Sequence, residues 1–549
     1  MRENLALGVA TLGLLLMAEQ GVSAEPASRN RSSAPGVSSA DQDVKNLAAT
    51  VSALESRVTA AEDQARAARA AAEGARARYV EQAQTFSASA TTAAVSRNSN
   101  GLHYKGVTIT LGGFVEGASI YRSRNDVSDI SSNFSRIPFQ NSPLAHTSEL
   151  RGTARQSRLS LLIEGDINTS THAAFYSEFD FQAGAQTSNS LESNSYVPRI
   201  RHVYGTLDWD DYGLHLLAGQ NWSLVTMNSK GITPRNEVPP AVIDGQYVPG
   251  FVWARQPQIR LVKDWNQTFW AAISVENPQS TFAAPATGIL STASGITVLT
   301  ASAGVSGFDN TNSLSINHIP DVVGKLAYEP MFGDTRPVHM EVFGIWRSYS
   351  DRINVAAGNA LGLPAGVGNA KADGGGVGAG ILATVIPKWL DIQASVLHGY
   401  GIGRYGSAQL PDATLKPDGS IAPIHETIFL AGGTLHATPQ LDLYVFGGGE
   451  SQSAHFFDAA GGHFGLGNPA ANLTAAACTT EGGTCAPNIR RVNQISAGFW
   501  HKLYTGDFGQ VRFGAQYSHT ELTAFAGVSG YAPATSDEMV FTSIRYYPP

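Results

Sequence analysis

Hydrophobic and polar residues alternate with a period of two along most of the chain, from about residue 101 to the C-terminus. The run Leu441-Asp-Leu-Tyr-Val445 is one example. This alternation places successive side chains on opposite faces of a β-strand. Segments of about ten such residues have the length of a tilted strand that crosses a membrane.

The spacing of these segments predicts sixteen strands. They are 107–121, 155–165, 171–183, 199–209, 213–221, 253–263, 267–277, 319–328, 337–349, 376–386, 389–400, 425–437, 440–450, 491–503, 508–519 and 538–547. Every second connection is short, and the others are mostly long and polar, which is typical of outer-membrane barrels. The sequence therefore predicts an all-β fold, a sixteen-stranded antiparallel transmembrane β-barrel over 107–549.

The amino end has a different pattern. Arg2 precedes an apolar run, and Val22-Ser23-Ala24 supplies a cleavage site with small residues, so 1–24 reads as a secretory signal peptide. The Ser/Pro/Ala-rich stretch 25–40 reads as a linker.

A heptad repeat follows the linker. Apolar residues recur every seven positions from Val44 to Tyr79, and a second set recurs from Leu47 to Ala75. This register predicts an α-helical coiled coil over 41–86, in the periplasm, although the sequence alone does not fix the number of helices. A second linker, 87–106, connects the coiled coil to the barrel.

Composition supports a membrane barrel but also fits a large soluble all-β protein. Only 15% of the residues are charged, against about 25% in typical soluble domains. The net charge of -8 argues against a nucleic-acid partner. No phosphate-binding loop or zinc spacing occurs, so we expect no cofactor and no metal. Cys478 and Cys485 are spaced to close a small loop disulfide in an oxidising compartment.

Sixteen strands leave an aqueous lumen, so the pattern predicts a channel. The third long loop, 222–252, is the expected constriction element because its prolines would stiffen it. An ordinary outward loop is the alternative. Its charged and phenolic candidates are Lys230, Arg235, Glu237, Asp244 and Tyr247.

The alternation also predicts which charges face the lumen, where they would set ion preference. With Leu159 and Leu161 facing lipid, Arg158 points inward, and the same parity applies to the other strands. The predicted inward cations are Arg158, Arg260, Lys325, Arg347, Lys502, Arg512 and Arg545, and the predicted inward acids are Glu164, Asp180, Glu276, Asp321 and Glu341. The alternative for each is a rim residue or a paired wall charge.

Four motifs resemble those of the DcaP-like trimeric outer-membrane porins. They are Arg255-Gln-Pro-Gln-Ile-Arg260, Thr153-Ala-Arg-Gln-Ser-Arg158, Ile200-Arg-His-Val-Tyr-Gly205 and Ala218-Gly-Gln-Asn-Trp-Ser223. The order of signal, coiled coil and barrel is also similar. The chain departs from the pattern at its end, where Pro548 and Pro549 follow the aromatic pair that usually closes such barrels.

The resemblance implies a homotrimer in the bacterial outer membrane, in contact with its lipid, that takes up small anionic solutes, with dicarboxylates as the expected class. It also implies that Arg255 joins Arg158 and Arg260 as a positive group of the pore. A phosphate-type or sugar-type porin is an alternative. An outer-membrane hydrolase is less expected, because His202, His398 and His425 are present without a marked nucleophile, so we expect no enzyme. A coiled-coil tether is less expected because the barrel fills most of the chain.

Overall fold

The computed structural model describes residues 101–549, except 184–195, 284–288, 304–312, 334, 461, 472–474 and 486, together with residues 52, 56 and 59. The chain divides into two units, 1–96 and 97–549. In the first unit, Ser52, Ser56 and Thr59 are helical, and the Ser56 hydroxyl donates to the Ser52 carbonyl at 2.9 Å. The predicted signal peptide and first linker lie outside the described residues, as do the rest of the coiled coil and residues 87–100 of the second linker.

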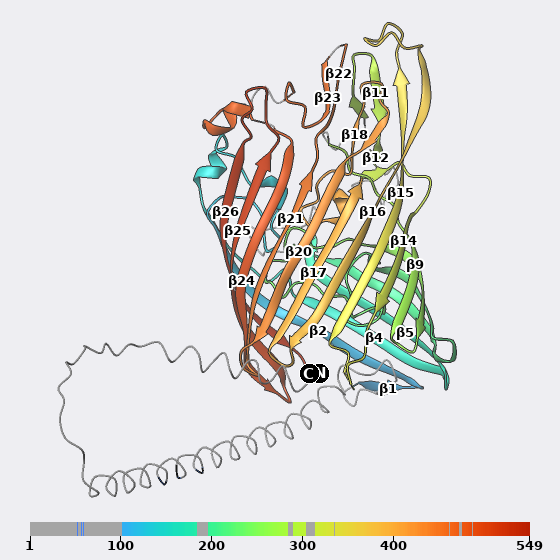
Figure 1. The fold of residues 1–549 in the computed structure, drawn as a ribbon, viewed down its shortest axis with the longest axis vertical. Coiled ribbons are helices and arrows are strands. Elements are labelled where there is room, and N and C mark those ends of the chain that lie inside the picture. The colour runs from blue at the N-terminus through green and yellow to red at the C-terminus, as the bar shows by residue number, and fades with distance from the viewer. Residues whose placement is uncertain are drawn as a thin grey trace, which may run out of the picture. The chain divides into compact units, whose positions relative to one another are not determined.

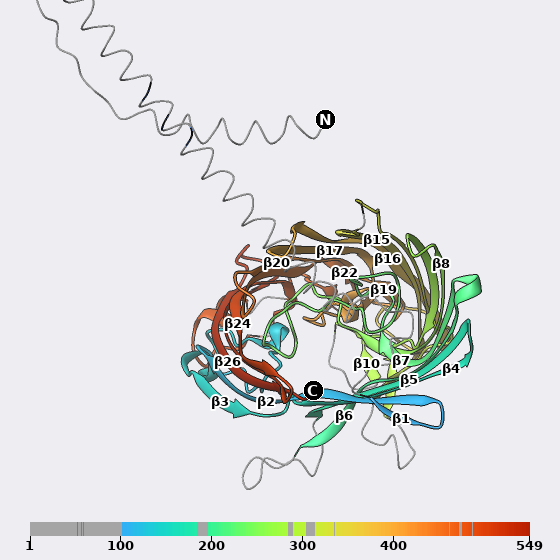
Figure 2. The same ribbon diagram turned by 90° about the horizontal axis from the view of Figure 1, so that it is seen from below.

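The second unit is a closed antiparallel β-barrel (Figures 1 and 2). Its sixteen wall strands among the described residues are β2 (Val107–Arg122), β4 (Arg158–Asn168), β5 (Thr171–Ala183), β6 (Val197–Trp209), β7 (Leu214–Trp222), β8 (Arg255–Trp265), β9 (Phe269–Glu276), β14 (Asp321–Tyr328), β15 (Val338–Val355), β16 (Gly366–Ile386), β17 (Leu390–Tyr400), β20 (His425–His436), β21 (Leu441–Gln452), β24 (Ile489–Gly506), β25 (Gly509–Ala524) and β26 (Ala534–Tyr547). Each pairs with the next wall strand, and β26 pairs with β2, from Val115 opposite Tyr546 to Arg122 opposite Met539. The predicted sixteen-stranded antiparallel barrel is therefore confirmed.

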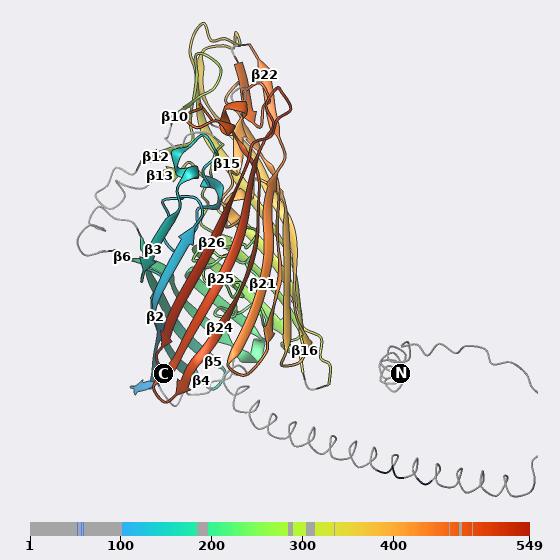
Figure 3. The same ribbon diagram turned by 90° about the vertical axis from the view of Figure 1, so that its left-hand side faces the viewer.

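Shorter elements lie in the long connections or at the strand ends. They are β1 (Leu102–Tyr104), β3 (Glu149–Thr153), β10 (Ile289–Ser291), β11 (Ile296–Leu299), β12 (Ala301–Ala303), β13 (Ser313–Ser315), β18 (Ala413–Leu415), β19 (Ile421–Pro423), β22 (His455–Ala459) and β23 (Gly462–Leu466), with the 3-10 turns η1 (Phe134–Arg136), η2 (Pro143–His146), η3 (Asp210–Tyr212), η4 (Gly403–Tyr405) and η5 (Ala475–Thr479). None of the described helices is long and apolar enough to cross a membrane. Figure 3 shows β10, β12, β13 and β22 at the end of the barrel opposite the short turns, whereas β1 lies at the short-turn end and η3 forms one of the short turns.

Of the wall strands, β15 and β16 extend furthest beyond their predicted bounds. The pairing of β15 with β16 continues from Val338 opposite Ala383 to Val355 opposite Gly366, and both strands rise above their neighbours in Figure 1. The start of β16 is rich in glycine, so it lacks the apolar alternation by which strands are recognised. The predicted boundary at residue 376 was therefore wrong by ten residues.

Alternation along β8 shows how the wall separates its two faces. Ile259 and Leu261 are 57% and 43% exposed on the outside, whereas Gln258 and Arg260 are buried inside. Aromatic residues beside the short turns are also exposed, as expected of an interfacial girdle. They include Tyr212, Trp265, Tyr328, Phe332, Trp389, Tyr504 and Phe508.

Histidines near the short turns join neighbouring strands inside the barrel. On β7, the His215 ring lies 2.7 Å from the carboxylate of Asp208 on β6 and 3.2 Å from that of Asp264 on β8. His436 lies in the same way between Asp442 and Asp391. Each ring nitrogen therefore has a partner on a different strand, which favours a single register.

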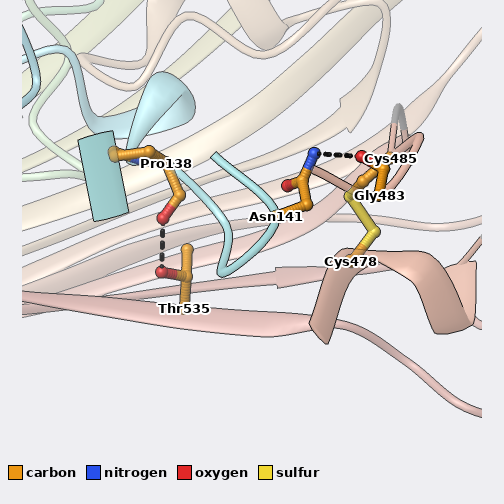
Figure 4. Close-up of a disulfide and its surroundings, with 6 residues drawn as sticks. All are labelled: Pro138, Asn141, Cys478, Gly483, Cys485 and Thr535. Atoms are coloured by element: carbon orange, nitrogen blue, oxygen red, sulfur yellow. Dashed lines mark hydrogen bonds between the residues drawn. A yellow bond between two sulfur atoms is a disulfide. The ribbon is translucent and has the colours of Figure 1, made fainter. Parts of the chain in front are cut away.

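The loop that precedes β24 contains the disulfide considered from the sequence. Cys478 is bonded to Cys485, and the Asn141 side chain donates to the Gly483 carbonyl at 2.9 Å (Figure 4). Thr535 in turn donates to the Pro138 carbonyl at 2.8 Å. The cross-linked loop is therefore tied to the first long loop, which is tied to β26.

The outward apolar face predicts a position-dependent cost of charge. We expect Ile259→Arg, midway along β8, to destabilise the barrel by about 2–4 kcal/mol, because the guanidinium would lie in the hydrocarbon. Leu150→Arg on β3, 74% exposed near the long-loop end, should cost roughly 0–1 kcal/mol. Urea unfolding in lipid vesicles measures both. Equal costs would show that the outer face of β8 is not in contact with lipid.

Candidate channel constriction

The connection between β7 and β8 folds into the barrel, as predicted for loop 222–252. The Trp500 indole on β24 donates to the Ala241 carbonyl at 2.9 Å, and the Gln393 side chain on β17 donates to the Val238 carbonyl at 2.9 Å. Because β24 lies on the side of the ring opposite β7 and β8, the loop crosses the lumen. Figure 2 shows this green segment inside the ring of strands.

The loop touches the far wall closely at Gly250. Its φ is +94°, and a Cβ there would lie 1.8 Å from the Phe429 carbonyl oxygen of β20, so only glycine fits. The Gly250 N–H donates to the Glu450 carboxylate at 2.9 Å, and the Ala408 N–H donates to the same oxygen at 2.8 Å. One buried carboxylate therefore anchors two loops.

The second of these loops, 401–424, was not predicted to enter the lumen. Ile402, Tyr405 and Leu410 are at most 1% exposed and pack against the barrel interior or the β7–β8 loop. The first long loop contributes Phe134, which is also buried against the β7–β8 loop. Three loops thus narrow the channel, where one was expected.

A cavity of about 290 Å³ lies where these three loops face the wall. Its lining is mainly polar and includes Ser131, Arg155, Gln182, Gln246 and Gln409. The Arg155 guanidinium lies 3.4 Å from the Asp129 carboxylate. Polar groups and a paired cation therefore line this part of the lumen.

A cluster of arginines lies on the inner wall formed by β4, β5 and β6. Arg199 donates to both Asp180 oxygens, at 2.9 and 2.7 Å. Arg201 donates to Glu178 at 2.5 Å and to Asp180 at 3.0 Å, and Arg158 lies 3.7 Å from Glu178. Three guanidinium groups thus surround two carboxylates.

Exposure decides which charges a solute meets. The side chains of Arg158 and Arg199 are 19% and 32% exposed, whereas those of Asp180 and Glu178 are 0% and 13% exposed. The arginines therefore cover the acids. The exposed surface of this wall is positive, although Arg158 and Arg199 are each paired with an acid.

Arg255 adds a fourth guanidinium without a carboxylate partner among the described residues. It lies over the Trp222 ring at 4.7 Å and over the Trp253 ring at 5.7 Å. Its Nη1 has no hydrogen-bond partner. The Trp222 ring contacts Tyr247 of the β7–β8 loop at 6.1 Å, so Arg255 is continuous with the cluster.

The pKa of Tyr247 reflects the electrostatic potential around its hydroxyl group. Arg201 Nη2 donates to the Tyr247 hydroxyl oxygen at 3.3 Å. Burial alone would raise the pKa of Tyr247, but the positive charges of Arg201, Arg158 and Arg255 lower it to about 8. A phenol acidified despite burial indicates a strongly positive environment.

Other predicted residues of the β7–β8 loop have structural contacts. Asp244 is fully buried and accepts the N–H groups of Ser132 and Gln246, and burial raises the pKa of Asp244. Glu237 accepts from Asn221 at 2.9 Å. Arg235 lies 3.8 Å from Glu164, and Lys230 is half-buried.

Three predicted inward cations point inward but are buried beneath the loops. Arg260 is 1% exposed and donates to the Trp222 carbonyl. Lys325 lies 2.6 Å from Glu341, itself buried, and Arg347 lies 2.7 Å from Asp412 of the 401–424 loop. These three residues hold the loops in place and neutralise acids. Because they are buried, the prediction that they line the pore has to be corrected.

Three further predicted cations form a row near the short turns. Lys502, Arg512 and Arg545 are register partners on β24, β25 and β26. Lys502 lies 3.2 Å from Asp442, and Arg545 lies 2.8 Å from Glu116. Arg512 has no carboxylate partner among the described residues and lies over the Tyr547 ring at 5.0 Å.

The sequence did not lead us to predict Arg199 and Arg201 as members of the arginine cluster on β4, β5 and β6. A register shift lies between the pairs Glu178–His202 and Phe179–Ile200, so Arg201 is the extra residue of a bulge. Both Arg201 and its neighbour His202 are therefore buried, which strict alternation does not allow. The signal was the pair of arginines that flanks Ile200, the first residue of a recognised motif.

Three solved structures align with this chain over most of its length. The outer membrane channel DcaP of Acinetobacter baumannii aligns with a TM-score of 0.55 and 18% identity, over 81% of this chain and 99% of that chain. An anion-selective porin from Comamonas acidovorans aligns with a TM-score of 0.43 and 12% identity, over 80% and 99%. OprB of Pseudomonas putida gives 0.43 and 10%, over 80% and 94%.

No family model and no curated protein matches the sequence. The resemblance to DcaP-like porins is therefore supported by the structure of the barrel and not by a sequence match, since the identity to DcaP is only 18%.

Proposed function

We propose that this protein is an outer-membrane porin through which small anionic solutes, dicarboxylates in particular, diffuse passively. The closed barrel, its apolar outer band and its aromatic girdle support a membrane-spanning position. The observation that carries the anion preference is that Arg158 and Arg199 are 19% and 32% exposed, whereas the Glu178 and Asp180 with which they pair are 13% and 0% exposed.

Guanidinium groups suit a carboxylate better than ammonium groups would. Arginine offers paired N–H donors that match both oxygens of a carboxylate. A solute with two carboxylates could contact Arg158 and Arg199 together, or pass from one to Arg255. Binding has to stay weak for the solute to leave, and the partial pairing of Arg158 and Arg199 with wall acids limits how strongly they hold an anion.

The alternatives receive less support. A phosphate-type porin would use the same arginines, and channel recordings in which phosphate and a dicarboxylate compete would separate the two. A hydrolase is not favoured, because His398 and His425 lie on the outer wall and His202 packs against Trp222 at 5.7 Å.

The first prediction concerns ion preference. The native channel should prefer chloride to potassium, and Arg158→Ala with Arg199→Ala should lower that preference several-fold, since one unit charge at about 4 Å contributes roughly 1 kcal/mol in water. Reversal potentials in a potassium chloride gradient measure this. Arg352→Ala, on the exposed upper part of β15, is the control and should leave selectivity unchanged. A cation-selective native channel would contradict the proposal.

The second prediction concerns pH. The pKa of Tyr247 is about 8, so the phenol is mostly neutral below that pH and becomes an anion above it. Ionisation adds a negative charge beside Arg201, and anion preference should therefore fall as pH rises from 7 to 9. Tyr247→Phe should remove this dependence while retaining anion preference at pH 7. A variant with the native pH profile would assign the titration to another group.

We also propose that the chain forms a homotrimer whose main interface is the barrel wall, with the 41–86 segment in the periplasm. Deleting 41–86 should leave a folded barrel whose oligomers persist, because the wall strands pair independently of that segment. Chemical cross-linking and the gel mobility of unboiled samples measure both properties. Recovery of the deletion variant only as a folded monomer would show that the barrel walls are not the main interface.

A further inference from the structure

Two histidines meet on the outer wall of the barrel, away from the lumen. His398 is on β17 and His425 is on β20, and the register places Tyr400 opposite His425 and His398 opposite Thr427. Their chain neighbours Leu397 and Glu426 are fully buried on the inner face. Alternation therefore places both imidazoles outside, at the long-loop ends of their strands.

The two rings are arranged with their Nε2 atoms together. These atoms are 3.0 Å apart, and the ring planes cross at 84°. The opposite nitrogen of each ring has its own hydroxyl partner: His398 Nδ1 lies 2.8 Å from Thr427 Oγ1, and His425 Nδ1 lies 3.2 Å from Ser453 Oγ. When each Nδ1–H donates to its hydroxyl, both Nε2 lone pairs face one another.

Such an arrangement is that of paired metal ligands. Metal-binding histidines usually donate their other ring N–H to an outer partner, which fixes the tautomer and the ring orientation. Facing lone pairs repel unless a cation or a shared proton lies between them. No cluster of three or more potential ligands occurs among the described residues, so the remaining positions around an ion here would be open to water.

The distance between the two Nε2 atoms sets the angle at a bound metal ion and therefore favours some metals over others. With metal–nitrogen bonds of about 2.0–2.1 Å, atoms 3.0 Å apart subtend roughly 90–97° at the metal. This is close to the right angle of adjacent ligands in square-planar or tetragonal sites, which Cu²⁺ and Ni²⁺ adopt, and smaller than the tetrahedral angle that Zn²⁺ favours.

We propose that His398 and His425 form a two-histidine site for a divalent transition-metal ion, with Cu²⁺ bound more tightly than Ni²⁺ and Zn²⁺. The bound ion joins β17 to β20 beside the base of the 401–424 loop. The site is independent of the channel function, because both ligands lie outside the lumen.

The test uses the full-length protein in detergent, without an affinity tag. Titration with Cu²⁺ should show one tight site per chain, and electron paramagnetic resonance should show two equivalent nitrogens. His398→Gln and His425→Gln should each weaken binding at least about tenfold, since losing even an outer partner costs about 10–100-fold. His501→Gln removes a lone exposed histidine on the outer face of β24 and should bind Cu²⁺ like the native protein.

Gel mobility of unboiled samples establishes that each variant is folded, and the nitrogen signal of the native protein tests the site without any substitution. A native protein that binds Cu²⁺ no more tightly than the double variant would overturn the proposal and leave a shared proton between the rings. A signal from a single nitrogen would overturn it as well. Tighter binding of Zn²⁺ than of Cu²⁺ would overturn the geometric argument.

Discussion

Closure of the backbone hydrogen-bond ladder between β26 and β2 is the constraint on which the rest of the structure depends. In hydrocarbon, an unpaired backbone N–H or C=O costs several kcal/mol, so a sheet can span a membrane only when it has no edge. The register from Val115–Tyr546 to Arg122–Met539 joins the last strand to the first. With both edges removed, side chains on the outer face need only be apolar, which explains why Ile259 and Leu261 tolerate exposure.

Closure also leaves a wide interior, which the loops fill. A ring of sixteen strands is too wide for its own side chains to fill, and the inward face carries many charges. The β7–β8 loop and the 401–424 loop occupy this space and bring backbone N–H groups to wall carboxylates, as Gly250 and Ala408 do at Glu450. Much of the inward charge therefore serves to hold loops. Removing one member of a buried ion pair, such as Lys325 with Glu341, would leave the other uncompensated, at a cost of about 3–5 kcal/mol.

The wall could be predicted from the sequence because its signal is local. Period-two alternation and the contrast between short turns and long loops depend only on neighbouring residues, and all sixteen strands were located by them. The loops could not be predicted in the same way. Whether 401–424 enters the lumen depends on contacts with residues far along the chain, such as Asp412 with Arg347. Parity correctly placed Arg260 inside, but parity carries no information on what covers a residue, so its burial was not foreseen.

The same distinction explains why the net charge of the chain does not predict the charge of the surface at the constriction. The chain carries a net charge of -8, yet exposed charges beyond about 10 Å are largely screened at 0.1 M salt. In the arginine cluster on β4, β5 and β6, Arg158 and Arg199 are more exposed to the lumen than Glu178 and Asp180. A passing ion is therefore nearer to the guanidinium groups than to the acids. The acids still matter, because they fix the positions of arginines that would otherwise repel one another. A positive surface at the constriction is therefore built from four guanidinium groups and two carboxylates, and Arg158 and Arg199 are more exposed than the acids with which they pair.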